Sequence, residues 1–249
     1  DHELFMAVPV YNSIKNPTTK AVFVYMSAGD AGQTNGWWEA REVGTVAATK
    51  TWVNLFGQYA PTIRTETVLL QGHHIQKVSV GNAVHYFIRL TEDGYRAVLA
   101  SQRRAPIDQP TEFYDNAQAL KEILKAIILV EATKVPRVSA TYSEYLDRDP
   151  SLPWDHDMHY SSGQLTAEMI NADPLFRNCV SQSPFYGYQH WLDAVNMNSP
   201  EASAQRAVWL NLDVAIRSIH GRKVWSDHSA ALGRSYPGLA SNRVAPCTF

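Results

Sequence analysis

The feature that most constrains the fold is a strand, a loop and a helix in immediate succession near the start of the chain. Residues 21–26 (AVFVYM) are all apolar and mostly β-branched or aromatic, which is typical of a strand covered on both faces. The loop at 27–32 contains two glycines, and residues 37–56 carry apolar side chains at helical spacing, with Gly57 in the position of a C-cap. This order predicts the opening of a βαβ unit. The side chains expected to face inward from the helix are Val46, Trp52, Val53, Leu55 and Phe56.

The middle of the chain has a different pattern, with three strand-like runs at residues 65–70, 75–80 and 83–90. The last two are joined by Gly81-Asn82, a two-residue hairpin signal, so an antiparallel flap or edge is expected here. Residues 92–114 are polar and irregular, with one glycine and two prolines, which predicts a long surface loop of a kind that is often functional.

The second half alternates helix and strand. A helix is expected from Asp115, a strand at 135–142, and a polar loop at 143–160. That loop leads into a helix near residues 163–171, for which Ser161 or Ser162 is the expected cap. The alternation predicts a single α/β domain over residues 1–249, with its ligand site beyond the carboxyl ends of its strands.

The last helix has the clearest boundaries. Ser199 is the expected N-cap, Pro200 stands at the first helical position and Gly221 lies just past the end. The side chains expected to face inward are Ala204, Val208, Leu212, Ala215 and Ile219.

Composition narrows the classes of ligand. The chain is 45% hydrophobic and 18% charged, which is typical of a globular protein rather than a disordered one, and it has no apolar run of about 18 residues that predicts a membrane span. The formal net charge is −2, and no basic block is longer than Arg103-Arg104, so nucleic acid and anionic membranes are not expected partners. Small molecules, sugars and protein surfaces remain.

Only two cysteines, Cys179 and Cys247, are present. This excludes a CxxC zinc site and a disulfide-dense scaffold. One disulfide between them and two buried free thiols both remain open.

The stretch at 154–160 (WDHDMHY) is the most informative for chemistry. His156 and His159 are three residues apart, which brings two imidazoles to one side of the backbone, so that one binds a metal while the other meets a metal-bound substrate. Asp155 and Asp157 are each able to accept the second ring N–H of a ligating histidine. The alternative is a solvated polar loop before a helix.

Three other stretches accompany this one: residues 1–7 (DHELFMA), residues 27–41 (SAGDAGQTNGWWEAR) and residues 185–188 (FYGY). In this order and at these intervals, the four stretches resemble the PIG-L/LmbE-like metal-dependent de-N-acetylases, the family of N-acetylglucosaminyl-phosphatidylinositol and mycothiol-pathway deacetylases. The resemblance covers most of the chain. It implies a Rossmann-like three-layer sandwich with a mostly parallel sheet and an antiparallel hairpin region.

The resemblance also implies residue roles. Asp1 matches the second aspartate of the family's His-(Pro/Gln)-Asp-Asp motif, a metal ligand, and His159 matches the second histidine of its His-x-x-His motif, also a ligand. His156 matches the histidine that serves as the acid or oxyanion-stabilising group, and Arg41 matches an arginine that contacts substrate. Three further candidate substrate-binding residues are Asp30, Tyr142 and Trp154.

The implied function is hydrolysis of the N-acetyl amide of an amino sugar or its conjugate, releasing acetate, with Zn²⁺ or another divalent metal as cofactor. Water attacks the acetamide carbonyl with a carboxylate as base, and His156 stabilises the oxyanion and protonates the leaving amine. Some relatives with an aromatic-rich helix like that at Trp37-Trp38 look secreted, which favours an extracellular location.

This chain departs from the family pattern in two places. The family's first metal-binding histidine and its general-base aspartate fall before Asp1, so we expect the natural protein to extend at the N-terminus by at least one strand that contains His-x-Asp. The glutamate common three residues after the substrate arginine is replaced by Gly44.

Two other functions are compatible with these residues. One is a non-catalytic glycan-binding protein with an incomplete metal site, and the other is a metallophosphoesterase, for which Arg41 and Arg148 supply few cations. The remaining histidines lack a partner at metal-ligand spacing and are expected at the surface or in structural hydrogen bonds: His73, His74, His85, His190, His220 and His228.

Overall fold

Two sheets form the β framework of the structure, a computed structural model that describes residues 1–147, 149 and 151–249. The larger sheet has the order β1-β4-β3-β2, and in the smaller one β5 and β6 pair in parallel. The strands are β1 (Ala21–Ser27), β2 (Ile63–Leu70), β3 (His73–Val80), β4 (Ala83–Leu90), β5 (Val138–Ser143) and β6 (Val180–Phe185).

The mixed α/β class is confirmed, but the expectation of a mostly parallel sheet is wrong for the larger sheet. Only β1 and β4 pair in parallel there, whereas β4 with β3 and β3 with β2 are antiparallel. The physical reason is the length of the connections, since Gln71-Gly72 and Gly81-Asn82 are two-residue turns and a parallel pair needs a crossover of about a dozen residues or more. Gln71, Gly72 and Gly81 have positive φ, which suits such turns.

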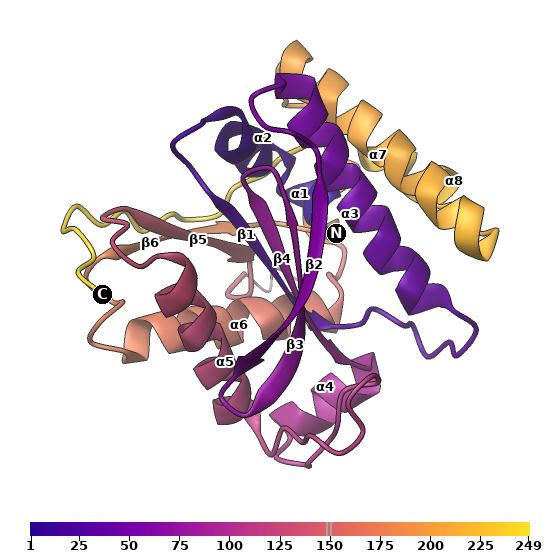
Figure 1. Cartoon of the computed structure of the whole chain (residues 1–249). Helices are drawn as coiled ribbons and strands as arrows, with labels where there is room; N and C mark the ends of the chain where they lie inside the picture. The colour runs from indigo at the N-terminus through magenta and orange to yellow at the C-terminus, as the bar shows by residue number, and fades with distance from the viewer. Residues whose placement is uncertain (148, 150) are drawn as a thin grey trace.

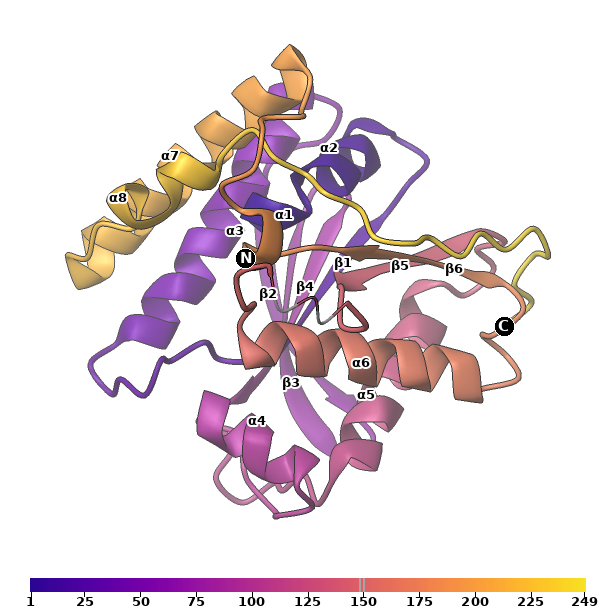
Figure 2. The same cartoon turned by 180° about the vertical axis from the view of Figure 1, so that it is seen from behind.

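Helices gather on the two faces of the larger sheet (Figures 1 and 2). Their bounds are α1 (His2–Phe5), α2 (Ala7–Lys15), α3 (Trp37–Phe56), α4 (Glu92–Leu99), α5 (Ala117–Glu131), α6 (Asp157–Ala172), α7 (Ser199–His220) and α8 (Trp225–His228), with short 3₁₀ turns at Tyr188–His190 and Ser229–Ala231. Alternate residues of β4 divide the core. Ala83 and Phe87 pack with α2, α3 and α7, while Val84, Tyr86 and Ile88 pack in a second cluster with α4, α5 and α6.

The predicted boundaries of α3 are confirmed, including Gly57 as a left-handed C-cap. Of its expected inward face, Trp52 and Val53 are buried, and Val46 and Phe56 are partly buried against the same cluster as α7, which lies along α3 in Figure 1. Leu55 is exposed, whereas Gly44 faces α7 so closely that a Cβ would lie 2.7 Å from Ile216 Cγ1. A side chain at this position would therefore displace Ile216 of α7.

One helix was not expected, and the expected starts of two others are wrong. In each case the helix begins after a capping residue that the sequence pattern did not select. Residues 92–99 form α4 instead of a loop, since the Thr91 hydroxyl accepts a hydrogen bond from Gly94 N and Tyr95 and Val98 are buried. Helix α5 is capped by Asn116 rather than Asp115, and α7 by Asn198 rather than Ser199.

Two further expectations on the second half are wrong in detail. The strand expected from residue 135 begins at Val138. On α7, Ala204, Val208 and Leu212 are buried as expected, but Ile219 is exposed and Ile216 takes its place in the core.

Cys179 and Cys247 form a disulfide, which decides between the two states that the sequence left open. The bond ties the last residues of the chain to the segment that precedes β6, and the chain between Pro237 and Ser241 forms antiparallel bridges with β6. Among the described residues, none of the helices combines the length and apolar character needed to span a membrane.

Candidate active site

Most of the predicted site residues meet beyond the carboxyl ends of the strands. Arg41 comes from α3, which follows β1, and His156 and His159 come from the start of α6, which follows β5. Asp1 reaches the same place from the N-terminus, which Figure 2 shows beside the start of α6. The structure thus brings Asp1, Arg41, His156 and His159 together from segments far apart in sequence.

Asp1 and His159 face each other at the centre of this cluster. Oδ2 of Asp1 lies 3.6 Å from Nε2 of His159, too far for a good hydrogen bond. Nδ1 of His159 lies 2.7 Å from Oδ1 of Asp155, and because a carboxylate only accepts, the imidazole proton belongs on Nδ1. In the neutral ring, Nε2 then carries a lone pair and lies near a carboxylate oxygen of Asp1. This nitrogen and oxygen can both coordinate a cation that lies between them.

The separation of these two atoms also fits zinc. Nitrogen and oxygen ligands at about 2.0–2.2 Å in a tetrahedral arrangement lie about 3.4 Å apart, close to the observed separation. Within residues 1–147, 149 and 151–249, no three His, Cys, Asp or Glu side chains are grouped to hold a metal. The described part of the site therefore offers two potential ligands, Asp1 and His159.

Asp155 holds the His159 ring in place. Its carboxylate is buried and accepts hydrogen bonds from the backbone N–H groups of His156 and Tyr188 as well as from His159 Nδ1. The sequence named Asp155 and Asp157 as alternative partners of a ligating histidine, and the structure selects Asp155. Asp157 instead accepts two hydrogen bonds from Arg96, at 2.6 and 3.0 Å.

Gly187 makes room for the Asp155 carboxylate. A Cβ added at Gly187 would lie 2.5 Å from Oδ2 and 2.8 Å from Oδ1 of Asp155. Any side chain at 187 would push the carboxylate away from His159. This contact explains why residue 187, in the stretch 185–188, is glycine.

Tyr188 packs against the same histidine. Its ring is stacked on that of His159, with 5.6 Å between the centroids and 7° between the planes, which fixes the imidazole in one orientation. Its hydroxyl lies 3.0 Å from Asp1 Oδ2 and 3.0 Å from His228 Nε2. Burial raises the pKa of this hydroxyl to about 12, so it is protonated at neutral pH.

Arg41 contacts the other oxygen of Asp1. One guanidinium nitrogen lies 3.3 Å from Asp1 Oδ1, and another donates to Gly29 O at 2.9 Å. Gly29 has a φ of +62°, which favours glycine, and a Cβ there would lie 2.1 Å from the guanidinium and would displace it. The loop between β1 and α3 thereby orients Arg41 toward Asp1.

His156 occupies an unexpected place, because it is itself the N-cap of α6. The helix begins at Asp157, and Ser161 and Ser162 lie inside it instead of capping it. Nδ1 of His156 accepts a hydrogen bond from Met158 N, so Nε2 carries the proton of the neutral ring. This nitrogen lies 4.0 Å from Glu92 Oε2 and the ring lies 5.8 Å from that of His159.

Glu92, at the start of α4, connects this histidine to the loop after β1. Its backbone N–H donates to Asp30 Oδ1 at 2.7 Å, and its side chain accepts from Ala31 N at 3.3 Å. Since residues 92–114 were predicted as a loop, the sequence did not reveal this residue. The helix that carries Glu92 could have been predicted from Thr91, because a threonine is a preferred N-cap residue.

The three remaining substrate-binding candidates have other surroundings. Asp30 is buried, and both its oxygens accept backbone N–H groups, from Glu92 and Gly32, which makes it a residue that shapes the loop. Tyr142 donates to Gln182 Oε1 at 2.9 Å. Trp154 is 77% exposed. Within the part of the chain that the structure describes, none of the three forms a hydrogen bond, ion pair or ring contact with Asp1 or His159.

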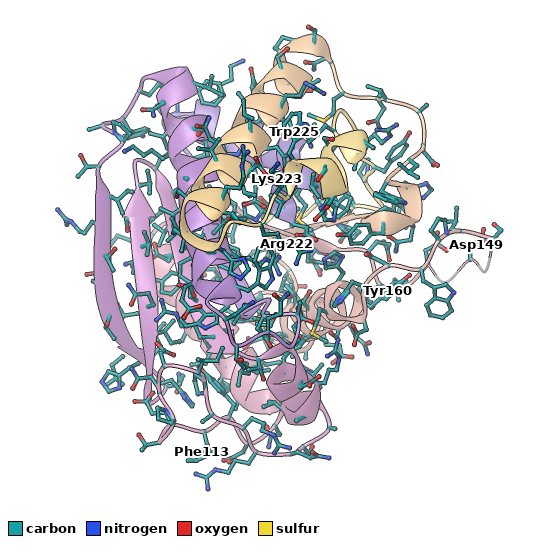
Figure 3. All side chains as sticks on the ribbon, turned by 90° about the vertical axis from the view of Figure 1, so that its right-hand side faces the viewer. Phe113, Asp149, Tyr160, Arg222, Lys223 and Trp225 are labelled. Carbon is teal, nitrogen blue, oxygen red and sulfur yellow. A yellow bond between two sulfur atoms is a disulfide. The ribbon has the colours of Figure 1, made fainter. Side chains whose placement is uncertain are left out.

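A small pocket lies beside Trp154. It is lined by Asp147, Asp149, Leu152, Pro153, Trp154, Tyr160 and Gln189. Figure 3 shows Asp149 projecting from the body of the molecule, while Tyr160 lies against it. An exposed indole at the edge of such a pocket is a surface on which a sugar ring can stack.

No protein-family model matches this chain, and neither the curated proteins nor the solved structures contain a match to it.

Proposed function

We propose that the protein is a zinc-dependent amidohydrolase that removes the acetyl group from an N-acetylated amino sugar or its conjugate. The observation that carries this proposal is the facing pair of Asp1 and His159, in which an imidazole nitrogen and a carboxylate oxygen lie 3.6 Å apart. Asp155 and Tyr188 hold the imidazole in this orientation. The order of motifs in the sequence agrees with this reading.

Each side chain of the site has a part in this chemistry. Asp1 and His159 would hold the metal, and zinc, when bound, would supply a Lewis acid that polarises the acetamide carbonyl and lowers the pKa of a water molecule. His156 donates a hydrogen bond from Nε2 to the acetamide oxygen as negative charge develops there, and the proton that the attacking water loses passes to the departing amine.

Arg41 and the pocket serve substrate binding in this proposal. The Arg41 side chain is 35% exposed, so it remains accessible to a hydroxyl of the sugar while it contacts Asp1. Trp154 stacks on a sugar ring, and Asp30 supports the loop that carries Gly29. The Tyr142 hydroxyl, already bonded to Gln182, is the weakest of these assignments.

We also propose that the fold is a Rossmann-like three-layer sandwich. Hydrophobic clusters on the two faces of the larger sheet and the parallel β5-α6-β6 unit support this arrangement.

Incubation of the intact protein with N-acetylglucosaminides and zinc tests the function. We expect release of acetate by the wild-type protein and loss of release in His159→Gln. A matched control is His74→Gln, because His74 is also paired with a carboxylate, Glu112, but lies on β3 outside the site. Absence of acetate from any acylated amino sugar, together with absence of bound zinc, would refute the proposal.

The second candidate function is non-catalytic glycan binding. The observation that favours it is the presence of only two potential metal ligands at the centre of the described site. Zinc content separates the two functions, since about one zinc per chain is expected of a catalytic site and none of a glycan-binding site that has lost its metal. Glycan binding without zinc or acetate release would establish the second function.

A further inference from the structure

His228 lies in the candidate site although its position in the sequence gave no sign of it. Its Nε2 is 3.0 Å from the Tyr188 hydroxyl, which is 3.0 Å from Asp1 Oδ2. We propose that His228 is a positioning residue that acts through Tyr188 to hold the Asp1 carboxylate toward His159. This inference rests on the proposed function, because it assigns His228 a role in the metal affinity of that site.

The direction of these hydrogen bonds follows from the chemistry of the groups. An ionised carboxylate only accepts, so the Tyr188 hydroxyl donates its single proton to Asp1. The hydroxyl oxygen then accepts from His228, which places the imidazole proton on Nε2. Nδ1 of His228 is left bare, and this atom is buried and has no hydrogen-bond partner among the described residues. Burial also lowers the pKa of His228, in agreement with a neutral ring.

The attachment of α8 to α7 gives His228 a fixed position. Asp213, buried in α7, accepts hydrogen bonds from the backbone N–H groups of Val224 and Trp225 at 2.8 and 2.9 Å. The Trp209 ring, also on α7, packs edge-on against His228 with 5.8 Å between centroids. Figure 3 shows Arg222, Lys223 and Trp225, which lead into His228, on the same face of the molecule as Tyr160.

The Oδ2 atom of Asp1 needs a hydrogen-bond partner of its own. Arg41 contacts Oδ1 only, whereas Oδ2 is the oxygen that faces His159 Nε2. A hydrogen bond from Tyr188 to Oδ2 prevents the carboxylate from rotating about its Cβ–Cγ bond. Loss of such a supporting partner reduces metal affinity by about 10–100-fold in well-studied zinc sites.

Zinc affinity of the intact protein, measured by competition with a chromophoric chelator, tests this role without reference to activity. We expect Tyr188→Phe and His228→Leu each to weaken zinc binding by about tenfold or more. His228→Gln should remain close to wild type, because its amide N–H reaches the position of Nε2. His220→Leu is the matched control, since His220 packs on Trp37 at the end of α7. Thermal unfolding of each variant verifies that it is folded.

The double variant gives the decisive comparison. If His228 acts through Tyr188, the combination of Tyr188→Phe with His228→Leu should bind zinc no more weakly than Tyr188→Phe alone. An unchanged affinity in His228→Leu, or a loss that adds to that of Tyr188→Phe, would overturn the inference while leaving the proposed function intact. A wild-type protein that binds no zinc would overturn both.

Discussion

Replacement of Gly163 by alanine is expected to displace the helix that carries both site histidines. Gly163 lies in α6 against the end of β5, and a Cβ at this position would lie 2.0 Å from the carbonyl oxygen of Ser143. Both partners are backbone, so no change of rotamer relieves the contact. Carbon atoms and their neighbours pack at about 3.5 Å, so α6 and β5 must separate by roughly 1.5 Å.

Two opposing contributions set the size of the effect. Alanine favours a helix over glycine by about 1 kcal/mol, which alone would stabilise the variant. Overpacking costs about 1–3 kcal/mol, and a contact between two backbones belongs at the upper end of that range. The net loss is about 2 kcal/mol, and at about 2–4 °C per kcal/mol for a chain of this size, Tm falls by about 4–8 °C.

Circular dichroism melts and zinc titration measure the two consequences. A shift of α6 also moves His159 relative to Asp1, and a misplacement of about 1 Å in a catalytic site can cost on the order of 100-fold in rate. Gln164→Ala is the matched control, because Gln164 is the next residue of the same helix and is exposed. A Tm of Gly163→Ala equal to or above that of wild type would refute the close packing of α6 on β5.

Three further predictions concern the contacts described above. Gly187→Ala should weaken zinc binding by about 10–100-fold, because the added methyl group moves the Asp155 carboxylate away from His159. Competition with a chelator measures the affinity. An unchanged affinity would show that the carboxylate does not have to move. Reduction of the Cys179–Cys247 disulfide, which spans 68 residues, should lower the free energy of unfolding by roughly 4 kcal/mol according to the chain-entropy model. Denaturant unfolding with and without reductant measures this loss. Coincidence of the two unfolding curves would contradict the prediction. Burial lowers the pKa of His85 from an unfolded value near 6.5 to about 3, so the stability from its neutral ring is complete above pH 6.5 and is lost as pH falls below that value. His85→Phe should therefore reduce the loss of stability between pH 7 and pH 5 by about 2 kcal/mol, and equal pH dependence of urea unfolding in both proteins would disprove this account.

Local pattern in the sequence was sufficient for the elements whose stability is local. The apolar run of β1 and the bounds of α3 with Gly57 agree with the structure, as do the three strands with their Gly81-Asn82 turn. In each case the side chains that define the element lie within a few residues of one another. Where several capping residues stood next to each other, as at Asp115-Asn116 and Asn198-Ser199, pattern alone selected the wrong one.

The strand pairing of the larger sheet was only partly predictable from local pattern. The hairpin turn was visible, but the pairing of β1 with β4 in parallel brings together segments separated by the whole of α3, β2 and β3. The pairing therefore depends on contacts between segments far apart in the sequence.

By itself the sequence predicted the mixed α/β class and singled out Asp1, Arg41, His156 and His159, which lie together in the structure. The tertiary structure decided the pairing of the two cysteines and the positions of Tyr188 and His228 beside Asp1. The physical reason is distance along the chain. A hydrogen bond between residues that lie far apart in sequence leaves no periodicity or spacing, and it forms only because the sheet and α7 have already fixed where those segments run.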